Sequence, residues 1–336
     1  MSDKAAMQVA APWHREVLQE LLTQHKEGRL PHALLLCGAK GTGKRRLAKA
    51  LLEAILCRSP VGGLACGACQ TCHLSAAGSH PDLVVLQPEE EGKAIRIDPV
   101  RALVEFCSLT PQYGDYRLAL VAPAEAMNRN AQNALLKTLE EPGNNTLLLL
   151  LSDQPGRLLA TVRSRCQLRM LEKPNHGVAL SWLTDQVGQP ERAAALLSLA
   201  SGAPLRALSL DGSEWFAERE KLLKQCLSLL AGRVPASMAA QSFVKLDVSG
   251  VLDALYGWSH DGLQYLARGR EPEDQQLSEL LKKLADRAGS ERLLAFAEQV
   301  ARCRRWLANG NNPNRDLMFE QLLLVLVGVD AGVSAF

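Results

Sequence analysis

The chain has 336 residues, more than one ordinary hydrophobic core supports, so we expect two or three domains. Its 38 basic and 36 acidic residues leave a net charge of +2, too small to indicate a nucleic-acid-coating protein by total charge alone. No apolar run reaches the roughly 18 residues of a membrane span. The first residues also lack the order of a signal peptide, so we expect a cytoplasmic protein without membrane contact.

Residues 1–169 alternate short apolar runs with helical patterns, which is typical of an α/β domain built on a mostly parallel sheet. The expected strands are Ala33 to Cys37, Leu83 to Leu86, Leu118 to Val121 and Leu147 to Leu151. Asp98 and Pro99 predict the N-cap and first position of a helix from about Val100 to Leu109. Asn128 predicts the start of a further helix, which Pro142 and Gly143 end.

After about Arg169 the strand pattern ends, and the rest of the chain has helical spacing. We expect a shorter helical domain over 170–211 and a larger one over 212–336, after the α/β domain over 1–169. The second helical domain contains long amphipathic stretches, whose apolar stripes are typical of simple core packing.

A glycine-rich segment follows the first expected strand and opens a helix, which is the context of a phosphate-binding loop. Its candidate phosphate-binding residues are Gly38, Gly41, Gly43 and Lys44. The next position should supply a Ser or Thr hydroxyl to Mg²⁺, and here it is Arg45, which cannot ligate a cation. The glycines and the helix N-terminus can still hold a phosphate. The alternative is an incidental glycine-rich turn.

A working ATP site also needs a carboxylate at the end of a second strand, where it organises Mg²⁺ and the attacking water. The strand ending at Val121 is followed by Ala122 and Pro123 instead. Glu125 is the nearest carboxylate, and we interpret it as a solvated side chain beyond the strand. Two losses at one site predict that this chain hydrolyses no ATP and holds no catalytic Mg²⁺. They leave ATP or ADP binding by its own loop open.

Cys57, Cys66, Cys69 and Cys72 follow the spacing C-x8-C-x2-C-x2-C. The short spacings let the thiolates converge, and four sulfurs complete a tetrahedral Zn²⁺ shell, so we predict a structural zinc site. The alternatives are four buried free thiols, or His73 or His80 in place of one sulfur. The remaining cysteines are expected to pack as small hydrophobes; they are Cys37, Cys107, Cys166, Cys226 and Cys303.

Two segments carry a resemblance to a known family. The run Asn133 to Pro142, NALLKTLEEP, and the later triplet Ser164-Arg165-Cys166 resemble bacterial clamp-loader subunits of the AAA+ class. In that family the gamma/tau subunits carry a complete phosphate loop and an Asp-Glu pair, and both are broken here. The chain is therefore similar to the delta-prime branch of the DNA polymerase III clamp loader. That resemblance implies an AAA+ nucleotide-binding-like domain with a zinc module at about 57–72, a helical lid and a helical collar.

The resemblance also implies a role for the triplet. Its loop would face a neighbouring subunit, with Ser164 and Cys166 flanking Arg165, which would approach the γ-phosphate of ATP bound there. The fixed fork of donors on a guanidinium suits that contact. Arg163 and Arg169 are nearby alternatives, and an ordinary surface charge is another.

An active subunit carries an arginine in its lid that touches its own nucleotide. Leu205 stands at that position here, and Arg206 lies next to it. The implied function is a non-hydrolysing stator that works with gamma/tau and delta subunits, the beta sliding clamp and primer-template DNA. The alternatives are an ATP-hydrolysing subunit of the same family, or a zinc-dependent DNA-binding scaffold with a vestigial AAA+ fold.

Overall fold

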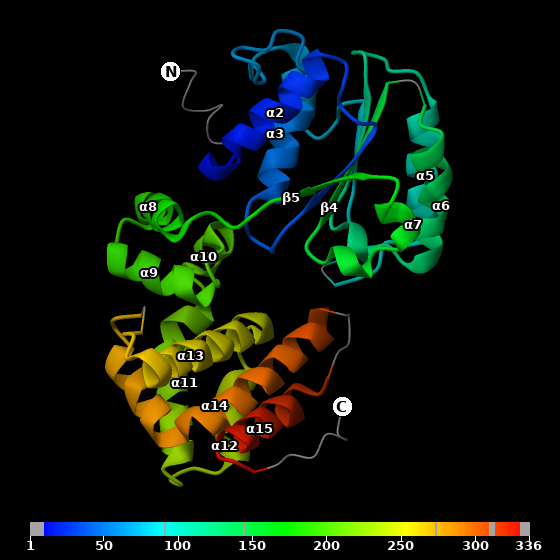
Figure 1. Cartoon of the computed structure of the whole chain (residues 1–336). Coiled ribbons are helices and arrows are strands. Elements are labelled where there is room, and N and C mark those ends of the chain that lie inside the picture. The colour runs from blue at the N-terminus through cyan, green and yellow to red at the C-terminus, as the bar shows by residue number, and fades with distance from the viewer. Residues whose placement is uncertain (1–9, 91, 144, 273, 309–312, 330–336) are drawn as a thin grey trace. The chain divides into compact units, whose positions relative to one another are not determined.

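The computed structural model describes residues 10–90, 92–143, 145–272, 274–308 and 313–329 (Figure 1). The chain divides into two compact units, Met1–Lys173 and Pro174–Phe336. The first unit is α/β and the second is helical, as the sequence predicts. Because 170–211 and 212–336 both fall largely within the second unit, their separation into two domains stays a prediction.

The first unit is built on a five-stranded parallel sheet with the order β2-β3-β4-β1-β5. The strands are β1 (Ala33–Cys37), β2 (Leu83–Leu86), β3 (Arg117–Val121), β4 (Thr146–Ser152) and β5 (Gln167–Met170). The four predicted strands are confirmed, and β3 and β4 extend slightly beyond their predicted ends. The sequence missed β5, an edge strand whose side chains are mostly exposed and which therefore has no apolar run.

Helices cover both faces of this sheet (Figure 1). Leu34 and Leu36 of β1 pack in one apolar cluster with α2 (Arg15–Lys26) and α3 (Lys44–Leu56). Leu35, between them, points to the opposite face and packs in a second cluster. That cluster draws on α5 (Ile97–Ser108) and α6 (Arg129–Glu140). The alternation is the period of a strand buried on both faces, as in other parallel sheets.

The starts of α5 and α6 test the predicted caps. Asn128 caps α6, because its side-chain oxygen accepts a hydrogen bond from Ala131 N at 2.8 Å. The predicted start of α5 is wrong: the helix begins at Ile97, and Asp98 lies in its first turn. Just before the helix, the backbone of Ile95 forms hydrogen bonds with the backbones of Ala126 and Asn128. These bonds set the direction in which the chain enters the helix. An aspartate in the first turn still favours the helix through its dipole.

Short segments complete the first unit. They are η1 (Pro12–His14), α4 (Gln70–Ala76), η2 (Ala124–Ala126), η3 (Pro155–Arg157) and α7 (Ala160–Arg163). Most of them lie in the connections between the main elements. They supply several side chains of the candidate site, among them His14, Cys72 and Glu125.

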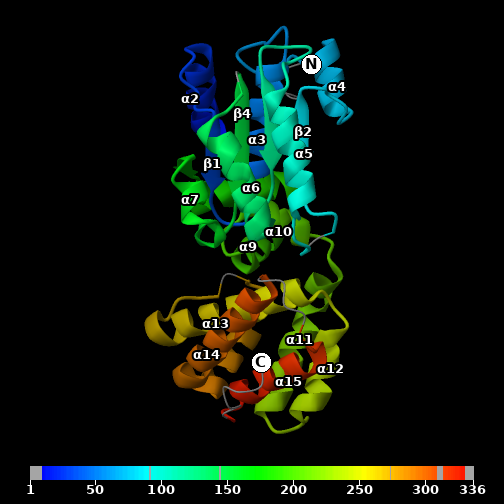
Figure 2. The ribbon, with the colours of Figure 1, turned by 90° about the vertical axis from the view of Figure 1, so that its right-hand side faces the viewer.

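The second unit is all helical (Figure 2). Its helices are α8 (His176–Val187), α9 (Pro190–Leu199), α10 (Pro204–Leu210), α11 (Glu214–Leu230), α12 (Ala236–Val244), α13 (Val248–Arg268), α14 (Ser278–Ala308) and α15 (Arg315–Leu326). One apolar cluster draws on each of them, with Trp258, Phe243 and Phe319 fully buried. The stripes of the long helices are therefore core packing, as predicted. Gly289 interrupts α14 with a φ of 76°.

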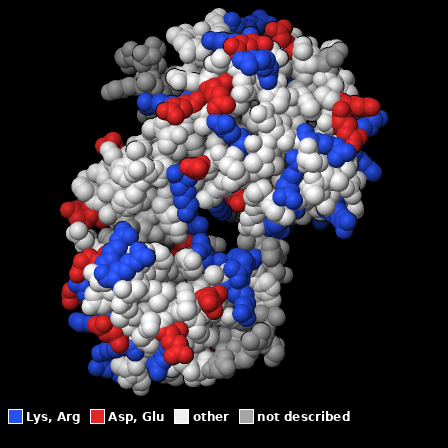
Figure 3. Space-filling view, in the orientation of Figure 1, with Lys and Arg blue, Asp and Glu red and all other residues white. Residues whose placement is uncertain are grey.

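The surface charges and the hydropathy of the helices were the two properties that the composition addressed. On the face seen in Figure 3, basic and acidic side chains are interspersed over the surface of each unit. Within the described ranges, no single helix is long and apolar enough to cross a membrane. Taken together, α9 and α10 reach that threshold by length and composition only, and they are bent by 108° at the break between them.

Candidate functional site

The phosphate loop has the predicted position between a strand and a helix. Strand β1 ends at Cys37, and helix α3 begins at Lys44. Gly41 and Gly43 have φ angles of 81° and 104°, which favour glycine at both positions. The strand-loop-helix geometry of a nucleotide-binding fold is therefore present, and the turn is more than an incidental glycine cluster.

The ammonium group of Lys44 is occupied by contacts within the protein. It donates to the carbonyl oxygens of Gly38 and Ala39, both at 2.8 Å, and lies 2.5 Å from Asp153 Oδ1. Only 6% of the side chain is exposed. A lysine has three N–H donors, and these three contacts use all of them. A phosphate in this loop would have to displace at least one of these contacts.

Arg45 extends to the place where a magnesium site would need a carboxylate. Its Nη2 donates to Ala122 O at 2.8 Å, at the end of β3, and its Nη1 donates to Gln87 Oε1 at 3.3 Å. A fixed positive charge at this point opposes a second cation. The sequence predicted that Arg45 cannot ligate Mg²⁺, and the structure adds that its guanidinium lies against the degenerate strand end.

The interpretation of Glu125 as a solvated side chain is wrong. Glu125 is 9% exposed, and its Oε1 accepts hydrogen bonds from the backbone N–H groups of Asp153 at 2.9 Å and Gln154 at 3.1 Å. It therefore ties the segment after β3 to the segment after β4. No local sequence feature indicates this role, because the partners are far apart along the chain.

Residues before α2 cover the phosphate loop, and sequence reasoning did not single them out. Trp13 Nε1 donates to Thr42 O at 2.7 Å. His14 is 2% exposed, and burial, with a smaller contribution from Lys44, lowers its pKa to about 4. The neutral imidazole adds no charge to the loop at pH 7. Only the folded chain brings these residues together.

The triplet Ser164-Arg165-Cys166 links α7 to β5. Arg165 donates from Nε to Glu140 Oε1 at 2.8 Å, its Nη2 lies 2.5 Å from the same oxygen, and its Nη1 donates to Thr161 O at 3.0 Å. Its side chain is 35% exposed. Ser164 Oγ donates to the same Thr161 carbonyl at 3.2 Å. Cys166 is buried, and burial raises the pKa of its thiol to about 12, so it packs as predicted.

Two other arginines singled out in the sequence are engaged elsewhere. Arg169, on β5, forms an ion pair with Glu20 of α2. Arg206, in the second unit, forms an ion pair with Asp253 of α13, whose other oxygen lies 2.7 Å from Arg304 Nη2. Asp253 is buried, and its two contacts link α10 and α14 to α13.

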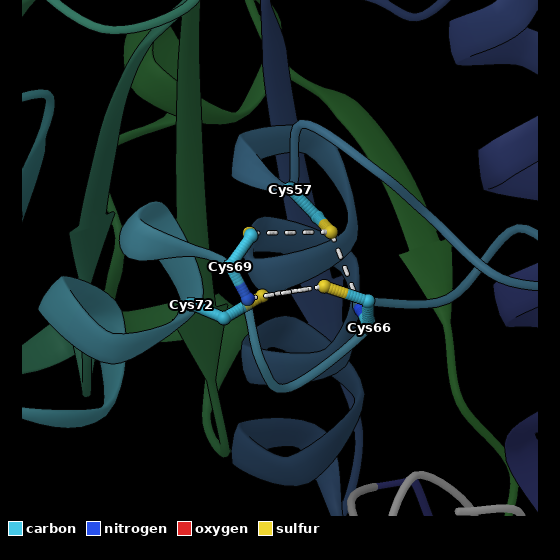
Figure 4. Close-up of side chains that lie close together, drawn as sticks. All are labelled: Cys57, Cys66, Cys69 and Cys72. Atoms are coloured by element: carbon cyan, nitrogen blue, oxygen red, sulfur yellow. Dashed lines mark hydrogen bonds between the residues drawn. The ribbon is translucent and has the colours of Figure 1, made fainter.

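The four clustered cysteines converge in space (Figure 4). Cys57 caps the end of α3, Cys69 precedes α4, Cys72 lies within α4, and Cys66 lies in the intervening loop. Their sulfurs all lie within 4.8 Å of one another. Cys66 N donates to Cys57 Sγ at 3.2 Å, and Cys69 N donates to Cys66 Sγ at 3.3 Å, contacts that stabilise thiolates.

The sulfur spacing matches a tetrahedral metal shell. Zinc–sulfur bonds of about 2.3 Å place neighbouring sulfurs about 3.8 Å apart in a tetrahedron. The pairs Cys57–Cys69 and Cys66–Cys72 are each separated by 3.9 Å. Among the described residues the group contains no histidine: His73 is exposed, and His80 is buried and accepts a hydrogen bond from Asp82 N. The set can hold one metal ion.

Comparison with known proteins places the chain in a family. Residues 13–175 match the family described as DNA polymerase III, delta subunit, and residues 213–327 match its C-terminal counterpart. DNA polymerase III subunit delta' of Pseudomonas aeruginosa is 39% identical over 320 residues, covering 93% of this chain and 96% of that protein. The chain belongs to the delta-prime family of DNA polymerase III subunits. The resemblance to this family is thereby confirmed, and the parallel α/β sheet followed by a helical unit agrees with the fold class predicted from the sequence.

The chain is also similar to tau subunits of DNA polymerase III. The tau subunit of Salmonella typhimurium is 29% identical over 229 residues, which cover 66% of this chain and 35% of tau. The crystal structure of a gamma subunit-related protein of Thermotoga maritima covers 92% of this chain and 98% of its own at 18% identity, with a TM-score of 0.46. Membership of the delta-prime family gives the chain a clamp-loader role in the DNA polymerase III complex.

Proposed function

We propose that the chain is a non-hydrolysing stator of the clamp loader, which supplies Arg165 in trans to ATP bound by an adjacent gamma/tau subunit. The observation that carries this proposal is the contrast between two cations. Lys44 is buried and fully engaged in its own loop, whereas Arg165 is partly exposed on the loop between α7 and β5. The lysine that a working loop would direct to the phosphates is therefore occupied, whereas part of the Arg165 guanidinium is open to a neighbouring subunit.

The loss of ATP hydrolysis in cis follows from the contacts of the loop. Asp153 neutralises Lys44, and Arg45 lies against the end of β3 where an active site needs a carboxylate and Mg²⁺. Neither change is compensated by Glu125, whose Oε1 is engaged by backbone N–H groups. Together these contacts support a loop that keeps the strand-loop-helix geometry but does not hydrolyse ATP.

The action of Arg165 in trans is electrostatic. As the bond to the leaving group loosens, negative charge spreads over the phosphate oxygens, and a guanidinium can bind two of them at once. The partners in this proposal are gamma/tau and delta subunits, with the beta sliding clamp and primer-template DNA in the assembled loader. In this proposal the chain acts in the cytoplasm, at the replisome.

The cysteine cluster completes the proposal. Cys57, Cys66, Cys69 and Cys72 hold a structural Zn²⁺, because four sulfurs leave no open position for a substrate or water. The chain after the α/β domain comprises a lid over 170–211 and a collar over 212–336 that ties the subunit to its neighbours in the clamp loader. The buried Asp253, with its two arginine partners, would then join lid to collar within one chain.

The proposal predicts that the chain's own phosphate loop is dispensable for turnover. The isolated protein shows no ATP hydrolysis with Mg²⁺, and Lys44→Ala leaves the DNA- and clamp-stimulated ATPase of the assembled loader unchanged. The physical reason is that Lys44 binds Gly38, Ala39 and Asp153 instead of a phosphate. Steady-state ATPase assays measure both results.

The matched control is the phosphate-loop lysine of gamma/tau changed to alanine in the same assembly, which lowers turnover. Thermal melting accompanies the assay, because Lys44 is buried and its loss leaves Asp153 without this partner. Clear turnover by the isolated chain that disappears in Lys44→Ala would contradict the proposal and favour an ATP-hydrolysing subunit.

A further inference from the structure

The side chain of Arg165 is held at one edge by Glu140, the last residue of α6. Nε and Nη2 both face Glu140 Oε1, at 2.8 and 2.5 Å. The opposite nitrogen, Nη1, donates to the Thr161 carbonyl of α7 at 3.0 Å. Two separate elements therefore fix the plane of the guanidinium before any neighbouring subunit is bound.

These contacts leave donors for a ligand. A guanidinium has five N–H groups, and each of the three nitrogens of Arg165 uses one in the contacts described. One N–H remains on each terminal nitrogen. These terminal nitrogens are the pair that can bind two oxygens of one phosphate group.

Helix stability gives no reason for a glutamate at this position. Glu140 ends α6 and is followed by Glu141, so two carboxylates stand at the negative end of the helix dipole. Acidic groups there destabilise a helix. The contact with Arg165 offsets that cost for Glu140, which also belongs to the NALLKTLEEP run.

We propose that Glu140 is a positioning residue, which orients Arg165 with its terminal nitrogens directed to the triphosphate of the neighbouring subunit. This inference rests on the proposed function. A free arginine samples many rotamers, and ordering it only when the phosphate arrives lowers the rate of the step it assists. The Glu140 carboxylate and the Thr161 carbonyl perform that ordering in advance.

The experiment measures ATP turnover by the loader reconstituted with delta, gamma/tau, the clamp and primed DNA. The part that depends on Arg165 is the difference from a loader carrying Arg165→Ala. We expect Glu140→Ala to lower that part about two- to ten-fold through kcat, the range of a partly exposed charge-assisted contact. Glu140→Gln keeps an oxygen acceptor and loses less. KM for ATP stays unchanged.

The control variant is Glu141→Ala, an exposed carboxylate beside it that leaves turnover unchanged. In the Arg165→Ala background, Glu140→Ala causes no further loss, which a merely structural role would not predict. Turnover equal to or above wild type in Glu140→Ala, or an equal loss in both backgrounds, overturns the positioning role. If Arg165→Ala itself leaves turnover unchanged, the proposed function fails first, so the two failures are distinguishable.

Discussion

Replacing Arg165 by alanine is expected to lower ATP turnover at the adjoining gamma/tau site by about a thousand-fold. The guanidinium is the partly exposed cation of the loop between α7 and β5. The methyl group of alanine cannot replace its positive charge beside the phosphate. Binding of ATP to the neighbour changes less than turnover, because the arginine acts most strongly on charge that develops in the transition state. DNA- and clamp-stimulated ATPase of the reconstituted loader measures the effect.

Variants of nearby arginines serve as controls for this result. Arg169 pairs with Glu20, so Arg169→Ala is expected to leave turnover near wild type, and Arg163→Ala likewise. Arg165→Lys keeps a positive charge but loses the fork of donors, so it recovers only part of the activity. Unchanged turnover and clamp loading in Arg165→Ala would remove the trans-acting role, and a loss in Arg163→Ala alone would transfer it to that residue.

The sheet could be predicted from the sequence wherever burial leaves a continuous apolar run. That condition holds for β1, β3 and β4, which are buried along their whole length. It fails for β5, whose exposed Leu168 and Met170 alternate with polar residues at an edge. The sequence also placed the start of α5 too late. Asp98 and Pro99 look like a local cap, but backbone pairing of Ile95 with the segment before α6 lets the helix begin earlier.

The parts of the site differ in the same way. The cysteine cluster could be predicted because its members lie close in sequence, and their convergence needs only a loop and one short helix. The loss of Mg²⁺ ligands was also visible, since Arg45 and Ala122 stand at defined motif positions. The contacts of Asp153 with Lys44 and with Glu125 were not visible, because they join segments that only the sheet brings together.

Removing one cysteine from the cluster of four is expected to produce the largest change in stability. Zinc binding to four-ligand sites contributes roughly 10–16 kcal/mol in small zinc-finger peptides, comparable with the roughly 5–15 kcal/mol that stabilises a whole domain. Cys66→Ser is the most informative variant, because Cys66 lies in the loop and is only half-buried, so packing losses are small. We expect loss of bound zinc and a melting temperature about 10 °C or more below wild type, since the first unit relies on this loop to end α3.

Elemental analysis and thermal melting measure the two effects together. We expect wild-type protein purified without chelators to contain zinc. Its melting temperature should fall in a strong chelator and recover when zinc is added back, whereas that of Cys66→Ser should not respond to added zinc. His73→Ala is the matched control, because this exposed histidine lies within the same segment and outside the ligand group. Wild-type protein without zinc, or Cys66→Ser with normal zinc content and melting, would show that the four sulfurs converge for packing alone.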